Sequence, residues 1–567
     1  MPRRVLRSLL LPGGFLLAGL AASGRFVFLD GWPHNHDGLA GFQRVEVFRL
    51  AFLSGDPFPV WTPLAQNGFG SAFPFFYHRL FNSLAALLSL VFGSTFAGVR
   101  ASVPLLLAAG GLGMARLLLA MNLPPLLAAG GGVLLVFANY TYQDWLVRGA
   151  FAEFTAFMLV PWVLLAALKT ARGDRGAGAV LGAVLALLFF AHSAVFLFAL
   201  PMLAVFFAVV ASGASGVASD RRKLARSLAV AAAVSGALAG PSLSGMALFR
   251  PFVSLEALAR KNLDVFRNFE PLGRYLVDLE RGGSFDAGAY SVEIGRGFNS
   301  AAVVLLILAA ILVARGRIPR ESLRGNGAAW ALVLVVGGMA FALQTPLGGE
   351  LYRLPGARYV SFPWRLLVFA TPASIGLLAL AVGLLSDVGG KTARSGLRAL
   401  FAAAVLFQVT FGLTTPLVSG TYTRVEVEAS LRKETLAAGF GFSGEYLPPG
   451  VTLPPSRPFL GATGCTVVSV SPQDAFRDPV EDPEFRATTD AVESPGSCRI
   501  SIRQFANPFL DVEAGPGGRI SAAADGSILV EPGPGRGDLA LRRRGLIAAL
   551  RAGVRGRFGG ARDAPRR

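Results

Sequence analysis

The fold is decided by residues 177–211, AGAVLGAVLALLFFAHSAVFLFALPMLAVFFAVVA, which contain no charged side chain. A helix that crosses the hydrocarbon core of a bilayer needs about 20 apolar residues, so this run is too long for one span. Polar side chains interrupt it only at His192 and Ser193. We therefore expect two membrane-spanning helices that turn at these two residues.

The composition of the whole chain agrees with a membrane protein. Hydrophobic residues make up 53% of the 567 residues, charged residues make up only 16%, and the mean hydropathy is +0.54. A chain of this composition is too apolar to fold as an ordinary soluble protein. The net charge of +18 does not indicate a nucleic-acid partner, because the basic residues fall in short clusters between apolar runs, where membrane topology explains them.

Eleven apolar segments are predicted to span the membrane. They lie near residues 8–28, 101–119, 124–139, 152–168, 177–192, 194–212, 228–245, 298–314, 328–344, 366–385 and 399–417. Consecutive basic connections, near 169–175, 221–226, 315–324 and 391–398, are separated by two spans each, so all four can face the cytoplasm. The predicted fold class is an all-α polytopic membrane protein with about eleven transmembrane helices.

A shorter apolar run, LFNSLAALLSLVF, occupies residues 80–92. Counting it as a span would invert every basic connection downstream, so we expect an interfacial helix on the outer face. The predicted organisation is a first transmembrane helix (1–29), a first extracytoplasmic loop with interfacial helices (30–99), a transmembrane bundle (100–417), a β-rich extracytoplasmic domain (418–540) and a basic tail (541–567).

The C-terminal part differs in character from the rest of the chain. Short alternating runs such as CTVVSVS, CRISIRQ and SILVE predict strands between turns. Cys465 and Cys498 each open one of these runs, so a disulfide between them can form in an oxidising compartment. The arginine-rich tail suits either an anionic lipid surface or disorder, and we expect disorder.

Ionisable residues gather in the first outer segment, WPHNHDGLAGFQRVEVFRL, residues 32–50. Asp37 and Arg44 are seven residues apart, which on a helix places them on one face two turns apart. Charged groups beside a membrane are costly and are commonly functional, so Asp37 is a candidate catalytic residue and Arg44 a candidate phosphate-binding residue. The simpler alternative is an interfacial ion pair between Asp37 and Arg44 or Arg49.

The same segment offers donors for a metal ion. His34, His36 and Asp37 carry imidazole and carboxylate groups, which are competent ligands for a divalent cation. The spacing is weakly specific, because such residues in a loop are more often simply solvated. A divalent metal ion therefore stays a hypothesis.

Two further clusters follow on predicted outer segments. In YQDWLVRGAFAEF, Arg148 could grip a phosphate and Glu153 could orient it or an acceptor hydroxyl. In ARYVSFPWRLL, Arg358, Trp364 and Arg365 could clamp a lipid phosphate. The alternatives are a helix-end anchor for the first cluster and a membrane-interface anchor for the second. Together, arginines and a carboxylate base are what transfer from an anionic lipid carrier to a hydroxyl requires.

Several motifs resemble those of a known bacterial group. HDGLAGFQR, GDPFPVWTPLAQNGFGSAFPFFYHRLFNSLAALL, VRGAFAEF, FPWRLL and EYLP are similar to motifs of the membrane proteins called "6-pyruvoyl-tetrahydropterin synthase-related". An acidic residue soon after the first span, followed by an interfacial helix, resembles the GT-C class of integral membrane glycosyltransferases. The resemblance implies a protein of the bacterial inner membrane. The basic connections and the number of predicted spans, together with Arg3, Arg4 and Arg7 before the first span, predict a cytoplasmic N-terminus and an extracytoplasmic C-terminal domain.

The resemblance also implies an activity. A GT-C enzyme moves a sugar from a polyprenyl-phosphate donor to a glycan or lipid acceptor. Asp37 matches the acidic position of the first loop and is therefore the expected general base, with Arg148, Arg358 and Arg365 as the expected phosphate-facing residues. Arg148, Glu153 and Arg365 fall in recurrent motifs of the group. One departure is Gly41, which stands where a histidine is expected four residues after the aspartate.

Two other classes of function stay open. A transporter or assembly factor for an envelope polymer would tolerate neutralisation of Asp37. A structural scaffold would retain partner binding in its isolated C-terminal domain. The predicted spans contain very few ionisable residues, such as Arg116 and His192, which favours a transferase over a transport path.

Overall fold

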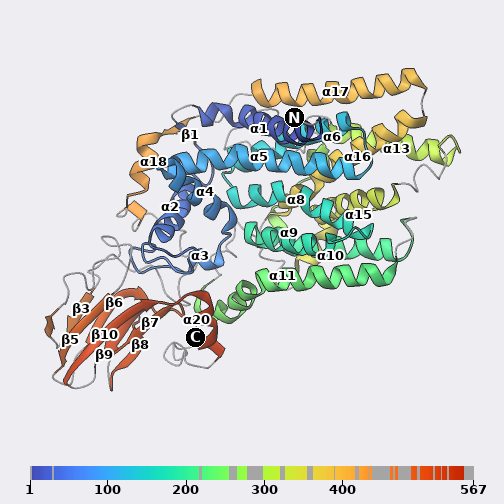
Figure 1. Ribbon diagram of the computed structural model, residues 1–567. Coiled ribbons are helices and arrows are strands. Elements are labelled where there is room, and N and C mark those ends of the chain that lie inside the picture. Colours follow the sequence, from blue (N-terminus) through green and yellow to red (C-terminus); the bar gives the residue numbers. More distant parts are fainter. Residues whose placement is uncertain are drawn as a thin grey trace. The chain divides into compact units, whose positions relative to one another are not determined.

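The computed structural model is helical through most of the chain and forms β-sheets near its C-terminal end (Figure 1). It describes residues 3–28, 31–215, 220–254, 265–276, 298–318, 326–353, 362–388, 390–414, 420–432, 435–436, 460–463, 466–469, 487–494, 499–514, 517–524, 526–532 and 535–554. The chain divides into two compact units. The first comprises Met1–Gly41, Ala97–Ala239 and Lys261–Arg424, and the second comprises Phe42–Phe96, Gly240–Arg260 and Val425–Arg567.

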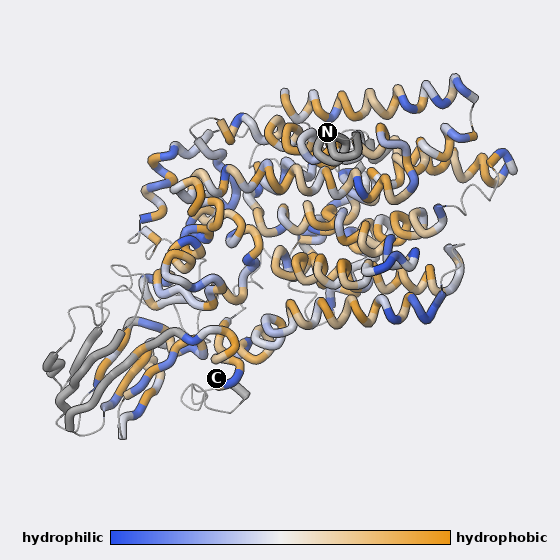
Figure 2. The backbone as a smooth tube through the Cα atoms, in the orientation of Figure 1, coloured by the Kyte–Doolittle hydropathy of each residue, from blue (hydrophilic) through white to orange (hydrophobic). Residues whose placement is uncertain are grey.

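The first unit is built from apolar helices. Its longer helices are α1 (Arg3–Val27), α5 (Thr95–Ala120), α6 (Pro125–Val136), α8 (Phe151–Ala171), α9 (Ala177–Ala191), α10 (Ser193–Ala211), α11 (Arg221–Phe249), α13 (Phe298–Ala314), α15 (Gly327–Leu343), α16 (Leu367–Val388) and α17 (Lys391–Thr414). Helix α11 belongs to the second unit from Gly240 on. Figure 2 shows apolar residues along these helices and hydrophilic residues mainly at their ends. The longest of them have the length and composition of membrane spans.

Seven helical segments of the described chain are long and apolar enough to cross a membrane, which makes this a multi-pass membrane protein. They are Thr95–Ala120, Pro125–Val147, Phe151–Ala171, Ser193–Ala211, Arg221–Phe252, Pro363–Val388 and Lys391–Thr414. The other four predicted spans fall on shorter apolar helices, Leu11–Val27, Ala177–Ala191, Ala301–Ala314 and Gly327–Leu343. The number eleven therefore stays a prediction.

The charge-free run forms the expected helical hairpin. Helix α9 ends at Ala191 and α10 begins at Ser193. His192 is the N-cap of α10, where its Nδ1 accepts a hydrogen bond from the backbone N–H of Val195 at 3.3 Å. The polar residue of the run thus satisfies one of the helix-end donors that have no partner within the helix.

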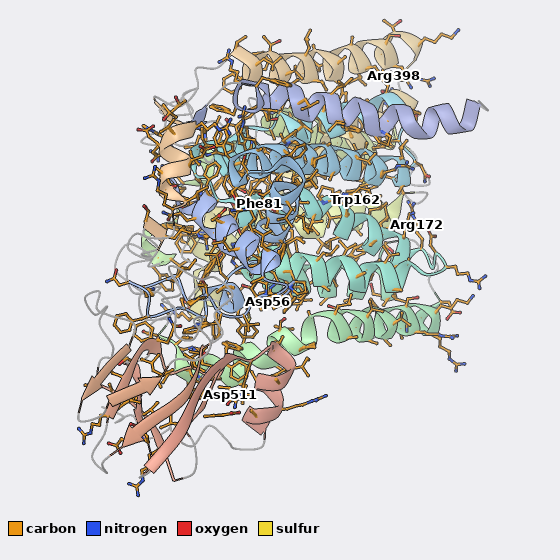
Figure 3. All side chains as sticks on the ribbon, turned by 60° about the vertical axis from the view of Figure 1, so that its left-hand side comes forward. Asp56, Phe81, Trp162, Arg172, Arg398 and Asp511 are labelled. Atoms are coloured by element: carbon orange, nitrogen blue, oxygen red, sulfur yellow. The ribbon has the colours of Figure 1, made fainter. Side chains whose placement is uncertain are left out.

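Two of the basic connections lie at the same end of these helices. Figure 3 shows Arg172, which follows α8, and Arg398, on α17, at the same end of the helices of the first unit. This is the arrangement that a common cytoplasmic side for the basic connections requires. The orientation itself stays a prediction.

The second unit combines short helices with two antiparallel sheets. Its helices include α2 (Ala40–Leu53), which begins in the first unit, and α3 (Phe73–Phe76), α4 (Leu80–Phe92), α18 (Arg424–Ser430) and α20 (Leu546–Val554). One sheet has the order β3-β6-β9-β8, with bounds Leu460–Thr463, Arg499–Phe505, Ser527–Glu531 and Arg519–Ala522. The other has the order β4-β5-β10-β7, with bounds Thr466–Ser469, Ala487–Ser494, Gly535–Arg543 and Leu510–Glu513.

The runs CTVVSVS, CRISIRQ and SILVE each contain a strand, as predicted. In β6, Ile500 and Ile502 are buried while Arg499 is exposed, so the strand alternates as a sheet with one covered face does. The disulfide predicted between Cys465 and Cys498 lies outside the described residues.

The core of this unit is not made by the C-terminal residues alone. Ile500, Ile502 and Val530 share one buried cluster with Phe69 and Phe75 from the first outer segment. Gln504 is fully buried in the same region and accepts a hydrogen bond from Trp61 Nε1 at 3.0 Å, and its Nε2 donates to Gly68 O at 2.8 Å. The strands after residue 418 therefore depend on a segment more than 400 positions earlier for part of their core.

Part of the basic tail is ordered, although we expected disorder. Helix α20 buries Leu546 and Ala549 in the cluster that contains Phe75. Leu546 also lies close to the Cα of Gly245, near the C-terminal end of α11. Apolar packing therefore holds the helix within the second unit, and this is the physical reason for its order.

Candidate active site

Four charged side chains of the first unit meet in a buried cluster. Asp144 lies on a π-helical turn, η1 (Gln143–Val147), Arg148 follows it directly, and Glu153 lies on the first turn of α8. Arg365 comes from η8 (Pro363–Leu366), a short 3-10 turn that begins with a proline and precedes α16. Single π-helical turns are rare and are frequently found at functional sites.

Glu153 is the centre of this cluster. Its Oε1 accepts hydrogen bonds from Tyr140 Oη at 2.5 Å and from Arg148 Nη1 at 2.9 Å, and its Oε2 accepts one from Arg148 Nη2 at 3.0 Å. Arg365 Nε lies 3.1 Å from Oε2, an ion-pair distance without hydrogen-bond geometry. Both carboxylate oxygens are thus engaged, and the side chain is only 2% exposed.

Arg148 joins the two acidic residues. Its Nη1 also donates to Asp144 Oδ1 at 2.9 Å, four residues earlier in the chain. Asp144 is fully enclosed, and its Oδ2 has no hydrogen-bond partner among the described residues. Two guanidinium groups therefore balance two buried carboxylates, which is the condition under which buried charges are tolerated.

The segment that carries Asp37 is fixed to the same place by its backbone. The N–H of His36 donates to Val147 O at 3.1 Å, and the N–H of Asp37 donates to Arg148 O at 3.0 Å. Asp37 itself is half-buried and acts electrostatically on Asp144. The carboxylate predicted as the base is thus next to the buried cluster, although more than 100 residues separate the two in sequence.

Gly149 allows the segment that carries Asp37 to lie close to the residues around Arg148. Its φ of +67° is left-handed, and a Cβ there would lie 2.6 Å from Asn35 Oδ1. Asn35 is buried two residues before Asp37, and neither polar atom of its amide has a hydrogen-bond partner among the described residues. On the other side of the loop, β1 (Gly31–Pro33) pairs with β2 (Thr421–Thr423), and the His34 ring packs on Tyr422 at 4.1 Å. The loop is therefore held from both sides.

The predicted site residues do not all come together. Asp37, Arg148, Glu153, Trp364 and Arg365 belong to one unit, and Trp364 is buried and stacks on Phe362 at 4.7 Å rather than anchoring at a surface. Arg358 lies outside the described residues.

The prediction that Asp37 and Arg44 share one helix face is wrong. Helix α2 begins only at Ala40, and a turn through Gly38, with a φ of +52°, precedes it. Arg44 belongs to the second unit, where its Nη1 donates to Tyr77 Oη at 2.8 Å.

The donors for a metal ion do not form a ligand set. Among the described residues, no group of three His, Cys, Asp or Glu side chains lies close enough to hold an ion. His34 and His36 are exposed. Gly41, the position of the expected histidine, packs against Phe151, whose Cε2 would be 2.7 Å from a Cβ at this position. The residues present therefore do not fit the divalent metal ion that we considered.

Sequence reasoning missed three members of this region. Tyr140 and Asp144 contact the cluster directly, and His192 is buried close enough to Arg365 and Arg148 for their charges to act on it. An i, i+4 pair of acidic and basic residues between two spans was the available signal for Asp144. His192 gave no signal beyond its place in the hairpin.

Comparison with known proteins gives weak structural similarity. No protein-family model and no curated protein matches the chain. Similar solved structures include the arabinofuranosyltransferase AftD from Mycobacteria, with a TM-score of 0.45, 16% identity, and coverage of 73% of this chain and 26% of that chain. The archaeal oligosaccharyltransferase AglB from Archaeoglobus fulgidus, solved with an inhibitory peptide and a dolichol-phosphate, has a TM-score of 0.44 and 14% identity. The match covers 78% of this chain and 57% of that chain. This chain covers about a quarter of the first and just over half of the second, and at these TM-scores neither similarity supports an argument about function.

Proposed function

We propose that the protein is a GT-C-like glycosyltransferase of the bacterial inner membrane. It moves a sugar from a polyprenyl-phosphate donor to an envelope glycan or lipid acceptor on the extracytoplasmic face. All eleven predicted segments cross the membrane, the N-terminus is cytoplasmic, and the β-rich part is extracytoplasmic. One observation carries the proposal, namely the hydrogen bond from the Asp37 N–H to Arg148 O, which fixes the segment that carries this half-buried carboxylate next to the cluster of Arg148, Glu153 and Arg365.

The proposed reaction uses these groups in one displacement. The acceptor hydroxyl oxygen attacks the anomeric carbon of the sugar, and a new glycosidic C–O bond forms. The bond from that carbon to the phosphate oxygen breaks, and the lipid phosphate leaves with the electron pair. Asp37 takes the hydroxyl proton as general base, and an arginine neutralises the charge that grows on the phosphate.

The cluster changes the role that we give to Glu153. A carboxylate whose two oxygens are held by Arg148, Tyr140 and Arg365 is poorly placed to accept a proton from an acceptor. Asp37 is therefore the proposed base, and Glu153 acts through the arginines that it binds. Arg44 has no role in this proposal, because it belongs to the other unit.

The experiment compares two single-atom substitutions in cells that lack the gene. Wild type, Asp37→Asn and Asp220→Asn are expressed at equal levels, and glycans and lipid-linked sugars are measured by mass spectrometry. Asp220 is the matched control, because it is exposed and its Oδ1 caps α11 by accepting hydrogen bonds from the N–H groups of Arg222 at 3.0 Å and Lys223 at 3.3 Å, a role that asparagine also fills. Its ion pair with Lys223 is exposed and contributes little to stability.

We expect Asp37→Asn to lose the sugar and accumulate its lipid carrier, as the deletion does, while Asp220→Asn restores the wild-type profile. Full restoration by Asp37→Asn would show that Asp37 is not the base and would favour a transporter or assembly factor over the proposed transferase. The scaffold alternative requires a C-terminal domain that works alone, and the shared core with Phe69 and Phe75 does not support it.

A further inference from the structure

The four charged side chains of the cluster differ in how much they are enclosed. The Asp144 side chain is 0% exposed, that of Glu153 2% and that of Arg148 11%, whereas that of Arg365 is 24% exposed. Asp144 and Glu153 are thus shut off from solvent, Arg148 is nearly so, and Arg365 forms the edge of the cluster. A ligand that arrives from outside would meet Arg365 first.

The members also differ in the donors that they have left. Both terminal nitrogens of Arg148 are used, Nη1 by Asp144, Glu153 and Tyr140, and Nη2 by Glu153. Arg365 approaches Glu153 only through Nε, and its two Nη atoms make no hydrogen bond to any residue that the structure describes. Its guanidinium carbon lies 5.2 Å from the centre of the Phe362 ring. The guanidinium is therefore held at one edge and on one face, and its outer edge keeps its donors.

We propose that Arg365 is the anion-binding group of this site, and that Asp144, Arg148 and Glu153 are positioning residues that hold its guanidinium in place. The two Nη atoms of one guanidinium match two oxygens of a phosphate in a bidentate arrangement. The ligand class is a lipid phosphate. Arg148, which the sequence predicted as an equal candidate, holds the Asp37 loop through its backbone and Glu153 through its side chain.

This inference rests on the proposed function and deepens it, because it selects the phosphate ligand from several arginines. Two kinds of lipid carry the same chemistry, a polyprenyl phosphate and the headgroup of a bulk anionic phospholipid. Both would satisfy the Nη atoms of Arg365. The experiment therefore offers each of them separately.

The binding test uses the purified full chain in phosphatidylcholine nanodiscs. A polyprenyl monophosphate is titrated, and its retention is measured by native mass spectrometry, with phosphatidylglycerol as the second ligand. The variants are Arg365→Lys, which keeps the charge but loses the planar fork, and Arg353→Lys as matched control. Arg353 is 67% exposed and pairs with Glu350 at 3.1 Å outside the cluster.

We expect Arg365→Lys to weaken polyprenyl phosphate binding about tenfold, since it replaces a bidentate contact by a single one, and Arg353→Lys to bind as wild type. Unchanged binding by Arg365→Lys would overturn the inference. Preferential retention of the polyprenyl phosphate by wild type assigns the site to the donor, and equal retention of phosphatidylglycerol assigns the same anion site to bulk lipid. A circular dichroism melt of each variant checks that it is folded.

The positioning role has its own readout. Glu153→Gln keeps the shape of the side chain but removes the charge that holds Arg365, so KM for the donor should rise several-fold while kcat per folded molecule changes little. A merely structural role would lower the amount of active protein, and hence apparent kcat, at an unchanged KM. Restoration of the donor KM by Glu153→Asp would show that the charge is what matters, and no restoration would contradict the positioning role.

The two proposals can fail separately. If Arg365→Lys loses lipid phosphate binding while Asp37→Asn still transfers sugar, the anion site stands and the assignment of the base fails. If Asp37→Asn abolishes transfer while Arg365→Lys binds the lipid normally, the transferase stands and this inference is wrong.

Discussion

A double substitution in the buried cluster should lower the free energy of unfolding by much less than the sum of the two single substitutions. Glu153→Gln removes the negative charge and one of the two oxygens that accept hydrogen bonds from Arg148, and it removes the ion-pair partner of Arg365, so two guanidinium groups face the charge of Asp144 alone. Arg148→Met leaves Asp144 without its cation. Removing one partner of a buried ion pair costs about 3–5 kcal/mol in the free energy of unfolding, so each single variant should lose about this amount.

The double variant keeps one charge of each sign, Asp144 and Arg365, so no net charge remains unbalanced. The sum of the single effects would be about 6–10 kcal/mol, and we expect the double variant to fall short of this sum by about 3 kcal/mol, the upper range for residues of one network. Reversible unfolding in mixed detergent micelles, followed by circular dichroism, measures all four proteins.

An exposed pair supplies the control cycle. Glu350→Gln and Arg353→Met break an ion pair whose side chains are 74% and 67% exposed, so each change should stay within about 0.5 kcal/mol. If the cluster variants were additive within the same margin, the four side chains would not act as one network. The reasoning about Glu153 as its centre would then be refuted.

Three further outcomes follow from the packing. Gly149→Ala puts a Cβ 2.6 Å from Asn35 Oδ1 at a left-handed φ of +67°, so thermal unfolding should show a loss of about 1–3 kcal/mol, and transfer should fall because the Asp37 loop shifts. Gln504→Leu leaves Trp61 Nε1 and Gly68 O unpaired in the core, so unfolding should show about 2–4 kcal/mol lost, at about 1–2 per orphaned group. Residues 418–567 expressed alone should give the dispersed amide spectrum of a folded domain only when residues 56–79 are added, since Phe69 and Phe75 are part of their core.

The sequence predicted those parts of the fold that depend on local patterns. The turn at His192 and Ser193 followed from the length of a charge-free run, and the strands followed from alternation in SILVE and CRISIRQ. Both patterns arise because each face of a helix or strand meets either apolar surroundings or water. The order of apolar and polar residues within the element is enough to show this. Chain segments that meet only after folding leave no such record.

The sequence predicted which residues belong to the candidate site, but it did not predict which of their side chains bind one another. Asp37, Arg148, Glu153 and Arg365 stood out as charges beside predicted spans, but nothing local indicated that Glu153 binds both arginines. The helix-face argument for Asp37 and Arg44 failed because a turn precedes Ala40, and a spacing of seven residues has meaning only inside one helix. The ordered α20 was missed because its apolar partners come from distant segments.

The central claim is that Asp37 removes the acceptor proton during sugar transfer from a lipid phosphate, and one reconstitution tests it most directly. Purified wild type and Asp37→Asn are placed in liposomes made from lipids of the deletion cells, where the sugar donor accumulates. Mass spectrometry then follows donor, product and free polyprenyl phosphate together. We predict that wild type releases one polyprenyl phosphate for each sugar transferred and that Asp37→Asn binds the donor without consuming it. Equal consumption by both proteins, or none by wild type with donor and acceptor present, would contradict the account.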